Sequence, residues 1–216
     1  LAGTSSRVFL GVQIQCAQCH DHKTEKWKQD DFRKFATSFL HFRLQPIEKG
    51  EKGEITQVEV KDFSHVLPRT AKDPELLPVR TATPTALDGS DLSRARNVGE
   101  ALASWITSKE NPWFADAIVN RMWGHYMGRG FVDPVDDLRP SNPPVAPDLL
   151  HALSKDFVDH GYDLRRLTQI ICAMQPYQIR SSATAHTDQG NRLFARFRLS
   201  PLGPEELLNA LFAATN

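Results

Sequence analysis

The chain has 216 residues, of which 40% are hydrophobic, and its 26 basic and 26 acidic side chains balance to a net charge of zero. This composition is typical of a globular protein and gives no sign of nucleic-acid binding through bulk charge. No apolar run approaches the roughly 20 residues that cross a bilayer, so no membrane span is expected. Three cysteines are too few for a disulfide scaffold. Because the chain opens at Leu1 rather than Met, we expect it to be part of a longer protein.

Apolar spacing predicts a mainly α-helical chain, and residues 1–45 form its first part. A helix is predicted over residues 5–20, where one apolar stripe recurs every three or four positions. The stripe consists of Val8, Val12, Cys16 and Cys19. It predicts that both thiols face the core near the end of that helix. A second helix is predicted from Asp30 or Asp31 through Leu40, with phenylalanines on its apolar face.

Residues 46–90 have a different character, rich in Lys, Glu, Pro and Thr, and are predicted to form an irregular, partly extended crossing. Within them, EITQVEVKDF at residues 54–63 is predicted as a strand or one arm of a hairpin.

Residues 91–216 are predicted to form a helical C-terminal domain. Each expected helix follows a capping residue or begins at a proline. These starts are Asp91 or Ser93, Asn111, Pro147, Asp163 and Pro204.

The stretch QCAQCHDHK at residues 15–23 carries the clearest chemical signal. Cys16 and Cys19 supply two thiols that can bond the two vinyl groups on one edge of a haem. His20 follows directly and can turn under the iron as its proximal ligand. The motif therefore predicts covalent haem c, bound by Cys16, Cys19 and His20, with His20 as the metal ligand.

Other interpretations of the motif stay open. A zinc site would combine the two cysteines with one or two histidines, although the chain has no second cysteine pair. The candidate histidines are His20, His22, His41 and His65. A redox disulfide, or two plain thiols beside a surface histidine, is a further alternative.

A second constellation lies in VNRMWGHYMGRG at residues 119–130 and the following DPVDDL loop. Arg121 and His125 are four residues apart and share one side of a predicted helix, while Asp136 lies in the loop. The structural interpretation is an arginine–aspartate clamp that fixes the loop to the helix. The functional interpretation is a site for a carboxylate or sugar hydroxyls, or an acid–base pair of His125 with an aspartate. Arg121, His125 and Asp136 are thus the candidate catalytic residues, and whether the protein is an enzyme stays undecided.

Two long stretches resemble a known domain pair. SSRVFLGVQIQCAQCHDHK with DDFRKFATSF resembles the end of a domain of unknown function from planctomycete-type bacterial proteins, which often carry a cytochrome c-like domain. The stretch from ALASWITS to PYQIRSS, with NRMW and GRG inside it, looks like the second domain of unknown function in the same proteins. After CHDHK the family commonly continues with Phe or Tyr, Asp and Pro, whereas this chain reads TEKW.

The resemblance implies an exported protein, periplasmic or at the cell surface, and it supports haem attachment at Cys16 and Cys19. The first function hypothesis is therefore electron transfer or a haem-dependent redox step, and the resemblance adds a link to polysaccharides. The redox partner would be a separate protein or a cytochrome domain of the same parent chain. The competing hypothesis is a non-catalytic binding or scaffold module whose motif holds a structural metal or free thiols.

Overall fold

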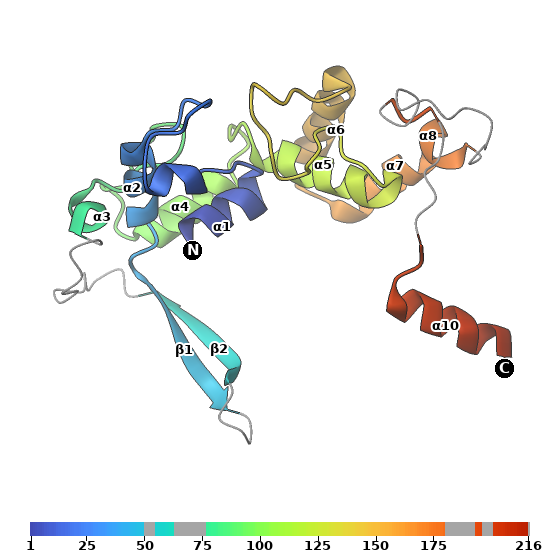
Figure 1. The fold of residues 1–216 in the computed structure, drawn as a ribbon, viewed down its shortest axis with the longest axis horizontal. Coiled ribbons are helices and arrows are strands. Elements are labelled where there is room, and N and C mark those ends of the chain that lie inside the picture. The colour runs from blue at the N-terminus through green and yellow to red at the C-terminus, as the bar shows by residue number, and fades with distance from the viewer. Residues whose placement is uncertain (50–54, 63–76, 180–192, 196–200, 216) are drawn as a thin grey trace. The chain divides into compact units, whose positions relative to one another are not determined.

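A computed structural model describes residues 1–49, 55–62, 77–179, 193–195 and 201–215 (Figure 1). Over these ranges the regular structure consists of helices and one two-stranded hairpin, so the predicted mainly helical class is confirmed. His65, one of the candidate zinc ligands, lies outside the described residues.

The chain divides into two compact units. The first comprises Leu1–Ile118 with Asp136–Pro143, and the second comprises Val119–Val135 with Pro144–Asn216. The boundaries near residues 45 and 90 come from sequence composition and stay a prediction.

The first segment is not the continuous helix that its apolar stripe predicted. The short helix α1 (Ala2–Ser5) continues as one π-helical turn (Ser6–Leu10) and ends at Gly11, whose φ of +65° is left-handed. The Gly11 carbonyl accepts a hydrogen bond from Leu138 N at 2.8 Å. An added Cβ at Gly11 would lie 2.8 Å from Leu138 Cδ1, so backbone conformation and packing both require glycine. Helical periodicity therefore stops at Gly11, and the prediction built on it was wrong.

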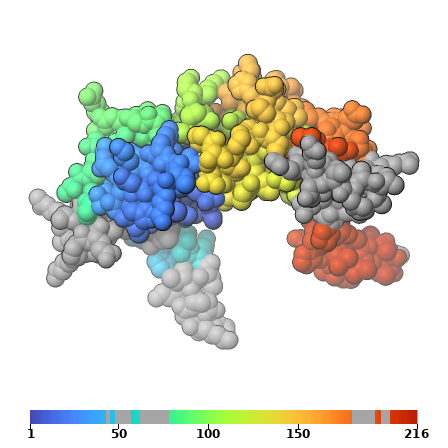
Figure 2. Space-filling view, turned by 45° about the horizontal axis from the view of Figure 1, so that its top comes forward, coloured from blue at the N-terminus to red at the C-terminus, as the bar shows by residue number. Residues whose placement is uncertain are grey.

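The first unit is organised around a core that joins its N-terminal residues to residues 86–102. The helices that contribute to it include α2 (Gln29–Thr37) and α4 (Val98–Ile106), while α3 (Leu77–Thr81) contacts α2 through a hydrogen bond from the Thr37 hydroxyl to the Val79 carbonyl. Figure 2 shows the blue N-terminal residues and the green residues of this unit packed together. The buried core residues are Ala2, Leu10, Val12, Ile14, Ala17, Trp27, Phe32, Phe35, Ala86, Leu87, Leu92 and Leu102.

Helices α2 and α4 both begin elsewhere than predicted. Helix α2 starts earlier, at Gln29 after Lys28, so neither Asp30 nor Asp31 is its N-cap; Asp31 lies within the first turn and accepts a hydrogen bond from Lys28 N at 2.9 Å. Helix α4 begins later than predicted, because its cap is Asn97, whose Oδ1 accepts from Glu100 N at 3.0 Å. Asp91 accepts instead from Ser93 N at 2.8 Å, in a turn before the helix.

The predicted strand exists and has a partner that the sequence pattern did not reveal. Strand β2 (Ile55–Asp62) pairs in antiparallel register with β1 (Phe42–Lys49). The register shifts after Pro46, which breaks the regular alternation in β1.

Helix α5 (Phe114–Met127) begins in the first unit and continues into the second. Its predicted cap is confirmed, since Asn111 Oδ1 accepts from Trp113 N and Phe114 N at 2.9 and 3.0 Å. The later helices are α6 (Pro147–Asp159), α7 (Leu164–Ala173), α8 (Gln175–Gln178) and α10 (Pro204–Thr215). Pro147 and Pro204 open α6 and α10, and Asp163 caps α7, as predicted.

Candidate functional site

Cys16 and Cys19 lie on a 3₁₀ turn (Gln15–Gln18) that Cys19 terminates. In a 3₁₀ helix, residues three apart eclipse each other, and a rise of about 2.0 Å per residue separates them by about 6 Å. The two thiols therefore share one face of the turn. Both are exposed, whereas Ala17 on another face is fully buried. The prediction that the cysteines face the core was wrong, because the turn that carries them is not a continuation of the first helix.

The His20 ring is held in one tautomer by its neighbour. Its Nδ1 lies 2.7 Å from the Asp21 carbonyl oxygen. A carbonyl can only accept, so Nδ1 carries a hydrogen, and in the neutral ring Nε2 then keeps its lone pair. Metal-binding histidines are commonly oriented by this kind of hydrogen bond from the other ring nitrogen. His20 is exposed, and its Nε2 is available as a ligand.

The turn is fixed to the start of α2 through Asp21 and Gln29. The Asp21 carboxylate accepts from Gln29 N at 2.8 Å. The Gln29 side chain donates to the carbonyl oxygens of Gln18 and Cys19 at 3.1 and 3.0 Å. These contacts hold the backbone around Cys19 and His20 without occupying a thiol or the His20 Nε2.

His22 closes the loop that follows the motif. Its Nδ1 accepts from Thr24 N and Glu25 N at 3.3 and 3.1 Å, and its backbone N donates to the Trp27 carbonyl at 2.8 Å. The second histidine of CHDHK therefore has a structural role, which is to hold the loop closed through these hydrogen bonds.

The TEKW segment, where this chain leaves the family pattern, has its own anchors. The Glu25 carboxylate accepts a hydrogen bond from the Ser141 hydroxyl. Lys26 Nζ lies 4.7 Å from the centre of the Trp27 ring. The segment is therefore tied to the first unit by contacts that involve its own side chains.

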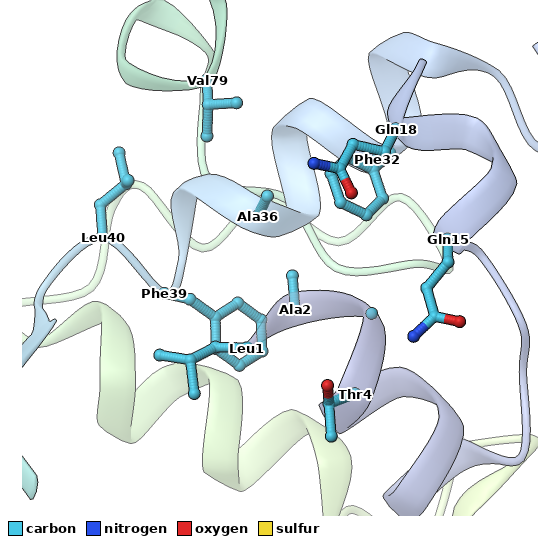
Figure 3. Close-up of a pocket in the computed structure, with 11 residues that line it drawn as sticks. Leu1, Ala2, Thr4, Gln15, Gln18, Phe32, Ala36, Phe39, Leu40 and Val79 are labelled. Carbon is cyan, nitrogen blue, oxygen red and sulfur yellow. The ribbon is translucent and has the colours of Figure 1, made fainter. Parts of the chain in front are cut away.

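A cavity of about 380 Å³ lies on a different face of the turn (Figure 3). Gln15 and Gln18, again three residues apart, line it together with apolar side chains that include Phe32 of α2 and Phe39, which follows that helix. Neither cysteine lines the cavity. The sequence analysis did not find it, because its walls come from segments that meet only in the folded unit.

The described residues contain no group of three or more His, Cys, Asp or Glu side chains placed to hold a metal ion. His41, a candidate zinc ligand, is buried at the end of the α2 region, and its Nδ1 has no hydrogen-bond partner within the part of the chain that the structure describes. The zinc alternative therefore has no preassembled ligand set in these ranges.

Asn120 is the residue of α5 that fixes the following loop. It is fully buried, and its amide binds the loop backbone by accepting from Val132 N at 2.9 Å and donating to the carbonyls of Val132 and Val135 at 3.0 and 3.1 Å. Gly130 packs against it so closely that an added Cβ would lie 2.7 Å from Asn120 Oδ1. The prediction for this loop was an arginine–aspartate clamp, and the buried asparagine adds direct hydrogen bonds to the loop backbone.

Of the three candidate catalytic residues, Asp136 belongs to the first unit, and Arg121 and His125 belong to the second. Asp136, in the first unit, lies 3.5 Å from Arg7 Nε and accepts from Gln13 Nε2 at 3.4 Å. His125 is exposed near the end of α5, with its ring 4.9 Å from that of Tyr126. Arg121 is half-buried on the same helix. Catalytic roles for these residues stay a prediction.

The other loop carboxylates form ion pairs with arginines that lie close to them in sequence. Asp133 lies 3.5 Å from Arg129 Nε, and Asp137 lies 3.1 Å from Arg139 Nε. These pairs support the structural interpretation of the loop, in which charge helps to fix its path.

A CxxCH-bearing helical segment followed by a helical C-terminal domain is the arrangement of planctomycete cytochrome-associated proteins. Residues 99–216, more than half of the chain, match PSD1, described as a protein of unknown function (DUF1553), and the chain belongs to this family. Residues 1–43 match PSCyt2, also described as a protein of unknown function (DUF1549). The predicted resemblance is thus confirmed, and Cys16 and Cys19 lie in the PSCyt2 segment. No curated protein and no solved structure matches the chain.

None of the helices in the described ranges has the length and apolar character that a membrane crossing requires.

Proposed function

We propose that the chain is part of a c-type haem protein, in which Cys16 and Cys19 form thioethers and His20 Nε2 binds the iron. One observation carries the proposal: both cysteines are exposed, three residues apart on a single 3₁₀ turn, and the neighbouring imidazole has its Nδ1 already committed to the Asp21 carbonyl. A bound haem would supply one-electron chemistry. The protein would hold the porphyrin edge through the thiols and orient the imidazole through Asp21. Gln29 would keep the turn in place.

The role we propose is electron transfer, or a haem-dependent redox step, in the periplasm or at the cell surface. The PSCyt2 segment supports an association with cytochrome c proteins. The partner would be a separate redox protein or a cytochrome domain of the same parent chain. A link to polysaccharides has only the family resemblance behind it and stays a prediction.

The test is the mass and spectrum of the chain after export in cells that contain a cytochrome c maturation system. We expect the intact mass to include one haem, and the pyridine haemochrome band to have the position typical of two thioether bonds. Replacing both Cys16 and Cys19 by serine should abolish the added mass. Cys172→Ser is the matched control, because Cys172 lies on α7 outside the motif, and this variant should keep the haem.

An unmodified mass in the matured wild-type protein would refute the proposal. Stoichiometric zinc that disappears in Cys19→Ser would instead establish the structural-metal alternative.

A further inference from the structure

Three of the four tryptophans form a connected row in the first unit. The ring centres of Trp27 and Trp113 are 6.2 Å apart, and those of Trp113 and Trp105 are 6.3 Å apart. At these separations the ring edges approach van der Waals contact. Electron exchange between neighbouring indoles is fast at such distances, because the overlap of their orbitals falls off steeply with separation.

The row begins in the loop that follows the CxxCH turn. Trp27 is the last residue of the loop that follows the motif, and its carbonyl accepts from His22 N at 2.8 Å. Its side chain is buried, with 8% of its surface exposed, so it faces the core rather than solvent. Trp105, at the other end, is half-buried on α4.

Charges at the two ends of the row differ in sign. Lys26 Nζ lies 4.7 Å from the Trp27 ring centre and 5.8 Å from that of Trp113. A cation there stabilises the neutral ring but disfavours a positive charge on it. Trp105 Nε1, in contrast, donates to the Asp88 carboxylate at 2.7 Å. A carboxylate at this nitrogen favours removal of an electron from the ring and can accept its proton.

Asp88 is in its charged form at neutral pH. Burial raises the pKa of its carboxyl, but hydrogen bonds from Trp105 and Ser90 outweigh that effect, and the net pKa lies below the ordinary value. The Ser90 backbone N donates to Asp88 Oδ1 at 2.9 Å, which leaves Oδ2 for Trp105.

We propose that Trp27, Trp113 and Trp105 form a relay that moves an oxidising equivalent away from the haem turn and delivers it to Trp105. The inference rests on the proposed haem function. The oxidant the proposal requires is a strong one-electron oxidant derived from a peroxide. One electron leaves the Trp105 indole and passes through Trp113 and Trp27 to that acceptor. The Nε1 proton moves to Asp88, giving a neutral indole radical and a neutral carboxylic acid.

A one-electron donor of the redox-partner class then reduces the Trp105 radical, and the proton returns from Asp88 to Nε1. The relay would protect the CxxCH turn from oxidative damage, because the oxidising equivalent leaves the turn and comes to rest on the half-buried Trp105 ring.

The test starts the oxidation at the motif without using haem. Cys16→Ser and Cys172→Ser leave Cys19 as the one thiol, to which a thiol-reactive ruthenium polypyridyl complex is attached. Light and a sacrificial acceptor then generate Ru(III) at that position, and tandem mass spectrometry locates oxygenated tryptophan in the full chain. We expect Trp105 to hold the largest share of the oxidised product.

Two variants probe the path and its end. Trp113→Phe keeps an aromatic ring but removes the easily oxidised indole, so the product at Trp105 should be lost and Trp27 should be oxidised instead. Asp88→Asn should move the largest share from Trp105 to Trp113. Asp91→Asn is the matched control, because this nearby carboxylate binds Ser93 N and not an indole, and it should leave the distribution unchanged.

Two results would overturn the relay. One is oxidised product confined to Trp27 in the wild-type chain; the other is a fraction of oxidised Trp105 that neither Trp113→Phe nor Asp88→Asn changes. Circular dichroism confirms that each variant is folded before it is scored. Since no haem takes part, failure of the relay leaves the haem proposal standing, and failure of haem attachment does not alter this result.

Discussion

Replacing Asn120 by alanine should destabilise the second unit more than any exposed substitution. The side chain is fully buried and makes three hydrogen bonds to loop backbone, two to Val132 and one to Val135. Alanine fills less space and has no polar group, so the variant leaves one buried N–H and two carbonyls without their partner.

The magnitude follows from the cost of unsatisfied groups. A buried donor or acceptor that loses its partner costs about 1–3 kcal/mol. The Val132 amide carries most of this penalty because it has a single hydrogen to donate, while rearrangement of the loop relieves part of the cost at the two carbonyls. We therefore expect a loss of about 3–5 kcal/mol in the free energy of unfolding.

Urea denaturation followed by far-ultraviolet circular dichroism measures the loss, and hydrogen exchange at the Val132 amide localises it. Asn209→Ala is the matched control, because Asn209 is exposed on α10 and the same substitution there should change stability by less than about 0.5 kcal/mol. If Asn120→Ala stays within about 1 kcal/mol of the wild type and Val132 remains protected, the assignment of Asn120 as the loop clamp is wrong.

Two further substitutions test the fold. Gly11→Ala should lower the free energy of unfolding by about 2–4 kcal/mol, because the new methyl group collides with Leu138 in addition to the roughly 1–2 kcal/mol strain of a left-handed residue. Gly161→Ala is the control: Gly161 has a φ of +67° and open space around it, so the substitution should cost the strain alone. Thermal melts compare the two variants, and equal losses would contradict the packing argument. Arg166 donates to both Asp156 oxygens at 2.9 and 2.8 Å, and this hydrogen bonding lowers the pKa of Asp156. Asp156→Asn should therefore lower stability by about 1 kcal/mol at neutral pH. This deficit should shrink as the pH falls below about 4, because the wild-type carboxylate is protonated as the pH passes through its lowered folded-state pKa and the ion pair is lost. A deficit that is constant with pH would contradict the ion pair as its cause.

Local sequence signals succeeded wherever a feature depends on residues close together in the chain. Asn111, Pro147 and Asp163 mark helix starts correctly, because a cap needs only one side chain and the N–H groups two or three positions later. The helical class and the CxxCH spacing were readable for the same reason. The family followed from ordered motifs in two stretches of the sequence, and both matches agree with it.

Only the tertiary structure decided how the motif is presented. The apolar stripe from Val8 to Cys19 has helical spacing, yet the helix stops at Gly11, which meets Leu138 from a distant part of the chain. That contact turns a predicted buried pair of thiols into an exposed pair. The tryptophan row depends in the same way on residues far apart in sequence, since Trp27 packs beside Trp113. Spacing records which residues can share a face, but long-range packing determines whether the face is buried, and no local pattern encodes that packing.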